Sequence, residues 1–344
     1  MKEALRELAL VAVAVLAATL VGALLIALRG HSPLEVYSVW LTEALGTSGG
    51  RSQVAFKATT LVFTALAASF AFKAGMFNIG AEGQLYVGAF SAALVGLALP
   101  AEWPALAAIP LIALAAAAGG WFAALLPGAL KAYRHTHEVI TTMMMNFILI
   151  SAVNYLLGIV RESAEVVRTA PIAAAWRLTK LERGYDGTTM ALWALLISAW
   201  VWAFFKKSRT GYELRVLGHS SGAAEYGGIA IASRTMLALG LSGALAGLGG
   251  LNFVLGSPGY FEQHFAPFQG YLGIAVALLA RNHPLAIAPA ALLFATMSEG
   301  SQAIQAWVPP ELGAILQAIM VVFVISAARL AEELRARRGV ETAA

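Results

Sequence analysis

The sequence predicts an all-α integral membrane protein, a polytopic bundle of about ten transmembrane helices with a broken segment near residues 73–84. Of its 344 residues, 59% are hydrophobic and 12% are charged, against roughly 25% charged residues in soluble domains. Apolar runs of about 17 to 23 residues recur along the whole chain, and each can cross a hydrocarbon core of about 30 Å as a helix. Because backbone groups in lipid must be hydrogen-bonded within the protein, these runs are expected to be helical.

The spans follow one another from the first run to the last. The N-terminal run exceeds the roughly 7 to 15 apolar residues of a signal peptide and lacks a small-residue cleavage site, so we expect a membrane helix there. Short polar or glycine-rich connections separate the later runs. The spans are predicted near residues 8–28, 54–72, 84–99, 105–126, 138–160, 189–205, 234–255, 268–281, 285–299 and 312–328.

Lysine and arginine predict which connections face the cytoplasm, because cytoplasmic loops carry an excess of both. The connections that contain Lys131, Lys206 and Arg281 fall on the side of the N-terminus when the spans are counted in order. An even number of spans then places both termini in the cytoplasm, across a bacterial-type plasma membrane. The connection 161–188 is expected outside despite its five basic residues, because moving it inside would strand the more basic 206–234 connection outside.

Several function classes are excluded by what the sequence lacks. With no Cys, it has no disulfide framework and no thiolate-ligated metal centre. It has no GxxxxGK[ST] motif, so it does not hydrolyse ATP by P-loop chemistry. Its basic residues are spread over short connections and do not form a nucleic-acid patch. No linker or low-complexity tail divides the chain, so residues 1–344 are expected to form a single membrane domain.

The broken segment reads KAGMFNIGAEGQ from residue 73 to 84. Each of its glycines costs a helix about 1 kcal/mol relative to alanine, which favours a break. Irregular backbone at membrane depth persists only where protein or a water-filled cavity satisfies it. Glu82 therefore either belongs to a buried hydrogen-bond network or faces a substrate path. The residues of this motif are Asn78, Gly80, Glu82, Gly83 and Gln84.

The connection at about 206–233 predicts a short helix that projects from the membrane. Ser220 or Ser221 can cap its N-terminus, residues 222–226 form about one and a half turns, and Gly227 with Gly228 can end it. Such a helix either docks in a groove of a soluble partner or lies as a solvated loop on the lipid headgroups.

The run SGALAGLGG at 242–250 has small residues four positions apart, a spacing that lets helix backbones approach closely. Gly243, Gly247 and Gly250 are the expected packing residues. The four residues 240–243 also match the GxSG of rhomboid-type intramembrane proteases, whose serine requires a histidine base. All six histidines of this chain lie at span ends or in connections, which weighs against that alternative.

The stretch HTHE at 135–138 lacks the i, i+4 spacing of two zinc-binding histidines, so no metal site is expected. Glu138 is placed where a helix N-terminus favours a carboxylate, and Asn146 in the same span should face protein and not lipid. The aromatic connection 256–270 is either an interfacial belt or part of a substrate entrance.

Taken in order, these stretches resemble the permease subunits of binding-protein-dependent ABC importers, in the branch that handles branched-chain amino acids, ribose-type sugars and nucleosides. The nucleoside-type permease is the nearest match. The resemblance rests on FNIGAEGQLYVGAF at 77–90, EVITTMMMNFI at 138–148, LRVLGHSSGAAEYGGI at 214–229, SGALAGLGG at 242–250 and GIAVALLARNHP at 273–284.

This resemblance implies that the projecting helix inserts into an ATP-binding subunit. Residues 219–222 depart from the family pattern, where Asn-Pro-like residues are expected, although serine can still cap the helix. The implied coupling residues are Gly218, Ser220, Ser221, Ala223, Ala224, Glu225, Tyr226 and Gly228.

The resemblance also implies partners: an ATP-binding subunit that holds ATP and Mg, a second permease, and an extracytoplasmic solute-binding lipoprotein. The chain itself is expected to need no cofactor and to have no catalytic residue, and the solute that the resemblance implies is a nucleoside. The alternatives are a self-contained ion-coupled secondary transporter or channel and, less favoured, an intramembrane protease. Ion coupling requires ionisable residues at span centres, whereas Lys57, Lys73, Glu82 and Glu299 fall nearer predicted span ends.

Overall fold

The computed structural model describes residues 19–163 and 165–307, with isolated positions at 13, 16, 17, 315, 318, 319, 322 and 326. Throughout this described part, every regular element is a helix, and β-structure is limited to two isolated bridges. The predicted all-α polytopic membrane fold is confirmed.

The helices follow the predicted spans closely, and four elements appear that the sequence did not predict: α2, the π-helix η1 after it, the one-turn helix η2, and α8. An apolar helix at Thr19–Leu28 opens the described chain. The elements after it are α2 (Pro33–Leu41), η1 (Thr42–Gly46), α3 (Ser48–Lys73), α4 (Ala81–Ala98), α5 (Ala105–Arg134), α6 (Glu138–Val160), η2 (Ala174–Trp176), α7 (Met190–Lys207), α8 (Arg209–His219), α9 (Ser221–Tyr226), α10 (Ile231–Gly249), η3 (Asn252–Gly256), α11 (Gln269–Leu279) and α12 (Pro284–Ala303).

Five helices in the described residues are long and apolar enough to cross a membrane: α3, α5, α6, α7, and α10 together with η3. The other predicted spans coincide with α4, α12 and two shorter apolar helices, Thr19–Leu28 and Gln269–Leu279. The predicted span 312–328 lies almost wholly outside the described residues. Helix α11 has 11 residues and is therefore about 16 Å long, roughly half of a ~30 Å hydrocarbon core.

The chain divides into two compact units, and α3 and α12 each cross the boundary between them. Unit 1 comprises residues 1–54 and 293–344, and unit 2 comprises residues 55–292. In the described part of unit 1, Ile26, Val36 and Ile304 form a small hydrophobic core. The hydroxyl of Tyr37 donates a hydrogen bond to the carbonyl of Thr19 (2.8 Å) and joins α2 to the helix before it.

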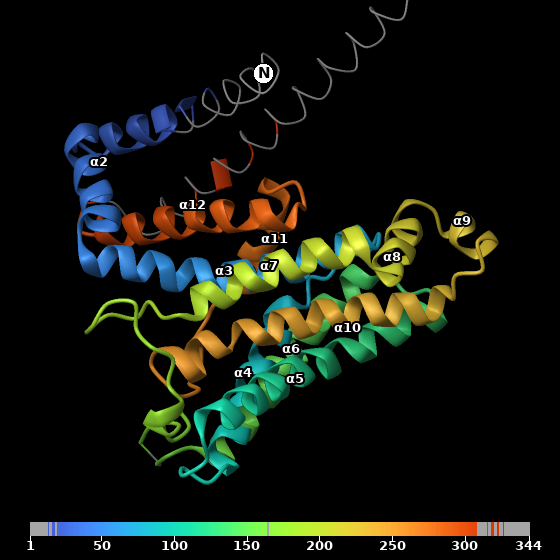
Figure 1. The fold of residues 1–344 in the computed structure, drawn as a ribbon. Helices are drawn as coiled ribbons and strands as arrows, with labels where there is room; N and C mark the ends of the chain where they lie inside the picture. The colour runs from blue at the N-terminus through green and yellow to red at the C-terminus, as the bar shows by residue number, and fades with distance from the viewer. Residues whose placement is uncertain are drawn as a thin grey trace, which may run out of the picture. The chain divides into compact units, whose positions relative to one another are not determined.

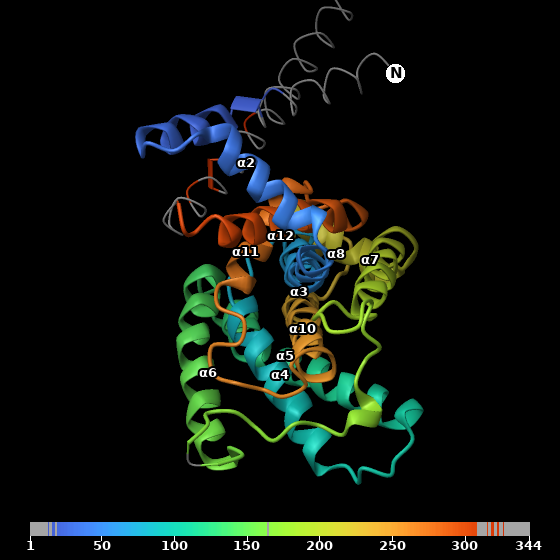
Figure 2. The same cartoon turned by 90° about the vertical axis from the view of Figure 1, so that its left-hand side faces the viewer.

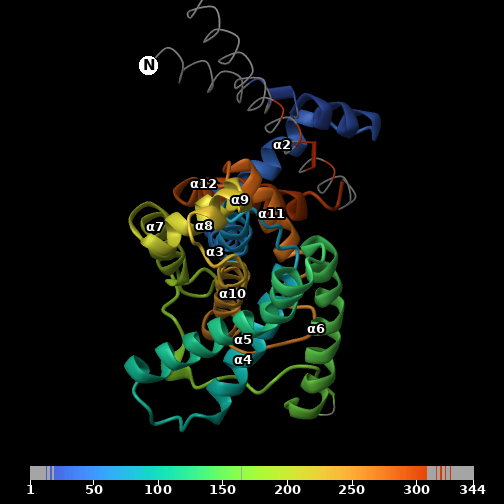
Figure 3. The same ribbon diagram turned by 90° about the vertical axis from the view of Figure 1, so that its right-hand side faces the viewer.

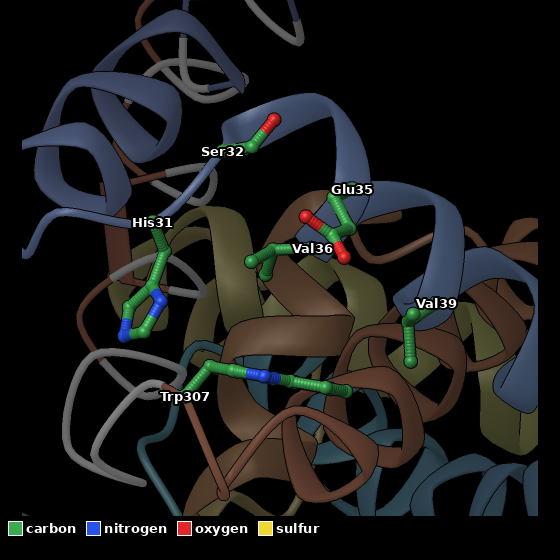
Figure 4. Close-up of a pocket in the computed structure, with 6 residues that line it drawn as sticks. All are labelled: His31, Ser32, Glu35, Val36, Val39 and Trp307. Carbon is green, nitrogen blue, oxygen red and sulfur yellow. The ribbon is translucent and has the colours of Figure 1, made fainter.

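A small hollow lies beside α2 in unit 1 (Figure 4). Its cavity volume is about 40 Å³, enough for a water molecule but not for a solute such as a sugar. In Figure 4 the His31 ring and the Trp307 indole border it on one side and Glu35 on the other. The hollow is therefore too small to be a transport site.

Unit 2 is built around α10, which runs side by side with α5 in Figure 1. Seen from opposite sides in Figures 2 and 3, α10 is central, with α6 on one flank and α7 on the other. Helix α4 packs against both α5 and α10. At one end, α9 projects beyond the ends of α5 and α10 (Figure 1).

The connections of unit 2 gather at two opposite ends. The segments 161–188 and 257–268 are joined by backbone hydrogen bonds, including Thr169 N–H to Phe261 O (2.8 Å), and the Trp176 indole donates to the carbonyl of Trp103 in the α4–α5 connection (2.9 Å). The α5–α6 and α7–α10 connections lie at the other end (Figure 1). The connection 161–188 is thus at the end opposite the basic connection 206–234, in agreement with the arrangement that the charges predict.

Candidate functional site

The break between α3 and α4 is held by an amide pair. Asn78 donates from Nδ2 to Gln84 Oε1 (2.8 Å) and accepts at Oδ1 from Gln84 Nε2 (3.1 Å). The same Oδ1 accepts the backbone N–H of Gly80 (2.9 Å), and Nδ2 also donates to the hydroxyl of Ser242 on α10 (2.7 Å). Asn78 and Gln84 are each 1% exposed. Every polar atom of the Asn78 amide therefore has a partner, as a buried polar group requires.

Helix α6 supplies the next partners of the break. Asn146 Oδ1 accepts the backbone N–H of Gly83 (2.8 Å), and its Nδ2 donates to the carbonyl of Ile79 (2.8 Å) and to the hydroxyl of Tyr271 (3.0 Å). The Thr142 hydroxyl accepts from Ile79 N–H (3.2 Å). These side chains satisfy backbone that no helix pairs, which is the condition for irregular structure at membrane depth.

Glu82 ties the break to the start of the half-length helix α11. Its Oε1 accepts the backbone N–H of Phe268 (2.7 Å) and its Oε2 accepts that of Gly270 (2.5 Å). Glu82 is 4% exposed. The first N–H groups of a helix have no partner within the helix and carry a partial positive charge, so a carboxylate suits them. Of the two alternatives for Glu82, these contacts favour membership of a buried network.

The predicted motif residues Asn78, Gly80, Glu82, Gly83, Gln84 and Asn146 all lie together in this network. Glu138 lies at the edge of it: its carboxylate forms an ion pair with Lys131 (2.8 Å), which closes the α5–α6 turn, and accepts a hydrogen bond from the backbone N–H of Phe77 in the break. The sequence missed Thr142 and Tyr271 as partners because a single hydroxyl within an apolar helix gives no signal of what it will meet.

Ser242 contributes to the same network and not to a hydrolytic site. Its hydroxyl donates to the carbonyl of Ala67 on α3 (2.6 Å) and accepts from Asn78, and the residue is 0% exposed. A serine nucleophile needs a base within hydrogen-bond reach, whereas this hydroxyl is hydrogen-bonded to the side-chain amide of Asn78 and to a backbone carbonyl. The protease alternative therefore loses its nucleophile.

The small residues of α10 bring three helices into backbone contact. A Cβ placed on Gly243 would overlap the carbonyl oxygen of Gly120 on α5, and one on Gly247 would overlap that of Ala116. On the neighbouring helix α4, a Cβ on Gly88 would overlap the backbone of Gly247, while Gly250 lies against Ala89. Close approach of this kind requires residues without side chains at the crossing points.

Helices α8 and α9 form the segment that the sequence predicted to project. The Ser208 hydroxyl caps α8 by accepting from Gly211 N–H (2.9 Å). The Ser220 hydroxyl caps α9 by accepting from Ala223 N–H (3.2 Å), and Gly228 follows with φ +72°, the left-handed conformation that glycine tolerates. The six-residue helix is therefore preformed. Its role in coupling remains a prediction.

Two predicted coupling residues contact the rest of this chain, one of them buried and the other partly exposed. Ala224 is 0% exposed, and Gly218 packs against the backbone of Lys73 and Gly75. A partner would instead meet the exposed positions of α9, among which Tyr226 is 98% exposed. The other exposed coupling candidates, on α9 and beside it, are Ser220, Ser221, Ala223, Glu225 and Gly228.

Glu213 on α8 is a further residue that sequence reasoning missed. It is 7% exposed and pairs with Arg209 (2.9 Å) and with Arg234 at the start of α10 (2.5 Å). The i, i+4 spacing of Arg209 and Glu213 was a visible signal, but nothing local pointed to Arg234.

The aromatic segment between α10 and α11 runs from the loop end of unit 2 down to Glu82. Phe261 and Phe265 pack on Tyr86 of α4, with ring centroids 6.3 and 4.7 Å away, and Phe265 also meets Phe253 (4.6 Å). Phe261 is fully buried. The inner part of this segment is thus packed core, which an interfacial belt would not be.

A hollow of about 600 Å³ lies in unit 2 between α3, α5, α7 and α10. It is lined almost entirely by hydrocarbon side chains, for example Phe63, Ile109, Ile197 and Leu251. A polar solute would lose its hydrogen bonds to water there without replacement. This hollow therefore does not suit a solute rich in hydroxyl groups.

The fold and motifs correspond to a known transport family. Residues 50–325 match the family described as "Branched-chain amino acid transport system / permease component". The match includes the break, α8, α9 and the half-length helix. The chain belongs to this permease family. The resemblance drawn from the five sequence stretches is confirmed.

Three ABC transporter permease proteins are similar to this one over 91% of its chain. A guanosine ABC transporter permease protein of Bacillus subtilis (strain 168) is 34% identical, with 92% of its own length covered. A glucose ABC transporter permease protein of Haloferax volcanii is 32% identical over 85% of its length. A nucleoside ABC transporter permease protein of Lactococcus lactis subsp. cremoris (strain MG1363) is 30% identical over 89% of its length.

Proposed function

We propose that this permease is the membrane subunit of an ABC importer and carries nucleosides into the cell. The observation that carries the proposal is the similarity, along nearly the whole chain, to a guanosine permease and a nucleoside permease. Similarity to a glucose permease makes a sugar the second candidate. A nucleoside contains a ribose, so the two candidates share hydroxyl chemistry and differ in the aromatic base.

The orientation follows from the two ends of unit 2. The end that carries α8 and α9 also carries Lys131, Arg134, Lys206 and Lys207, so by the positive-inside rule it faces the cytoplasm. With the even number of predicted spans, both termini are then assigned to the cytoplasmic side of the plasma membrane. The paired segments 161–188 and 257–268 face outward, where a solute-binding lipoprotein delivers its cargo.

Energy is supplied by a separate subunit. The chain has no P-loop, and α9 presents a preformed, exposed helix at the cytoplasmic end. A helix that docks in a groove of the ATPase transmits motion as a rigid body. ATP and Mg²⁺ are bound by that partner, and the permease itself performs no hydrolysis.

A second permease completes the pathway between the two membrane subunits. Within unit 2, the polar groups around Asn78 and Glu82 form hydrogen bonds with one another. They are therefore not free to bind a solute. Solute selection is then assigned mainly to the binding protein, and the permease provides a low-affinity path. Alternating access requires that the loaded receptor and ATP each favour one conformation by a real free-energy difference.

The test is uptake by the complete transporter in proteoliposomes. The permease, its ATPase, the second permease and the binding protein are reconstituted, and uptake of radiolabelled guanosine and of glucose is measured with and without ATP. We expect ATP-dependent uptake of guanosine that other nucleosides compete with, and none by the permease alone. Uphill uptake without the ATPase would refute the importer assignment. Uptake of glucose in place of guanosine would refute the nucleoside assignment only.

A further inference from the structure

Two glycines that are far apart in the sequence touch through their backbones at the cytoplasmic end of unit 2. A Cβ on Gly218, near the end of α8, would lie 2.5 Å from the carbonyl oxygen of Lys73 and 2.8 Å from the nitrogen of Gly75. A Cβ on Gly75 would lie 2.8 Å from the Cα of Gly218. Real Cβ atoms essentially never approach so closely. No side chain lies between α8 and the chain that follows α3, so none can rearrange there when α8 moves.

Helix α8 is also fixed on its other sides. Buried Glu213 bridges Arg209 (2.9 Å) and Arg234 (2.5 Å), so α8 is tied to the first turn of α10. Gly211 lies against the backbone of Phe204 at the end of α7. Helix α9 follows α8 directly. A force on α9 therefore reaches the Gly218–Gly75 contact, because few side chains along α8 can rearrange and absorb the movement.

The segment beyond Gly75 leads straight to the buried network. Four residues separate Gly75 from Gly80, and among them Asn78 is hydrogen-bonded to Gln84 and Ser242. Two residues further, Glu82 holds the first N–H groups of α11. Packed interiors transmit strain because they contain few voids. A displacement of α8 is thus delivered to the start of α11 through backbone contacts and buried hydrogen bonds.

We propose that Gly218 is a positioning residue of the transport cycle, and that its backbone contact with Gly75 passes movement of α8 and α9 to the break and, through Glu82, to α11. This inference rests on the proposed ATP-driven import. It assigns Gly218 to the inner side of the coupling segment and leaves contact with the ATPase to the exposed positions of α9. The two roles are therefore separable by mutation.

Gly218→Ala in the complete transporter tests the inference. The added Cβ pushes α8 away from Gly75 without altering the exposed face of α9. We expect the number of solute molecules imported per ATP hydrolysed to fall about tenfold, within the range of ordinary coupling free energies, while the ATPase still co-purifies. Gly158→Ala is the matched control, because a Cβ on this α6 glycine meets nothing within 4 Å. It should keep the wild-type ratio.

A second variant keeps the inference testable where Gly218→Ala does not assemble. Glu213→Gln removes the charge that pairs α8 with Arg234 and adds no volume. The number of solute molecules imported per ATP hydrolysed should again fall. Glu102→Gln, in an exposed connection, is the control and should not change this number. A wild-type ratio in an assembled Gly218→Ala or Glu213→Gln transporter overturns the inference. Absence of ATP-driven uptake by the wild-type complex instead overturns the proposed function, and the inference with it.

Discussion

Glu82 explains how a carboxylate is accommodated inside an apolar helical bundle. Its two oxygens meet two backbone N–H groups at the start of α11, 2.7 and 2.5 Å away. Burial of an unpaired charge is costly, but hydrogen bonds from a helix N-terminus offset that cost. The carboxylate therefore serves as the cap of a helix that begins within the membrane and has no cap of its own.

Glu82→Gln should destabilise the isolated permease. The amide offers one acceptor oxygen where the carboxylate offers two, so one buried N–H of Phe268 or Gly270 loses its partner, at about 1–3 kcal/mol. The thermal unfolding midpoint in detergent should fall, and Glu82→Leu should lower it further. Glu102→Gln, on an exposed connection, is the control and should not shift it. An unchanged midpoint for Glu82→Leu would show that the cap contributes nothing to stability.

At the scale of elements, α8 and α9 have different surroundings although they are contiguous. Helix α8 is held by Glu213 and by close glycine contacts with α3 and α7. Helix α9 is capped by Ser220 and is exposed at every position except Ala224, with Tyr226 at its end 98% exposed. Large exposed aromatics on a rigid element are typical anchors of protein interfaces. This division suits two separate roles, in which α9 contacts the partner and α8 passes movement to the rest of unit 2.

Tyr226→Ala should weaken binding of the ATPase without altering the fold of the permease. Truncation of an aromatic anchor costs about 2 kcal/mol in a typical interface, which is roughly a thirtyfold loss of affinity. Titration of the purified ATPase onto immobilised permease measures this. Tyr155→Ala is the matched control, since Tyr155 is an exposed tyrosine on α6, away from α9. Equal affinity for Tyr226→Ala and wild-type permease would place the ATPase contact elsewhere.

At the scale of the whole molecule, the connections of unit 2 are sorted to two ends. Backbone hydrogen bonds join 161–188 to 257–268 at one end, and the basic α7–α10 connection lies at the other (Figure 1). The basic residues of the 161–188 segment are offset in part by acids, as in the Arg168–Glu162 pair (3.0 Å). The charge rule, which counts lysine and arginine only, is therefore least informative for that segment.

Single cysteines will test this orientation directly, because the natural sequence has none to remove. We expect Glu165→Cys to react with a membrane-impermeant maleimide in intact cells. Tyr226→Cys should react only after the cells are permeabilised. Both positions are exposed, so access to reagent and not burial decides the outcome. The opposite labelling pattern would invert the proposed topology.

Most helix positions were predictable because the length and hydropathy of an apolar run determine whether it crosses the membrane as a helix. The predicted spans 138–160 and 189–205 agree with α6 and α7 to within two residues. The predicted span 268–281 likewise agrees with α11 to within two residues at each end. Helix α8 was missed because it is polar on most faces and is held by contacts with three other elements.

The sequence by itself determined the helical class, the place of the break and the capped helix near 221–226, because each depends on residues close together in the chain. Glycine content, capping hydroxyls and apolar run length act locally. Only the tertiary structure decided that Glu82 binds Phe268, that Ser242 binds Asn78 and that Gly218 meets Gly75. Those partners depend on how helices cross, and crossing is set by packing of many side chains at once.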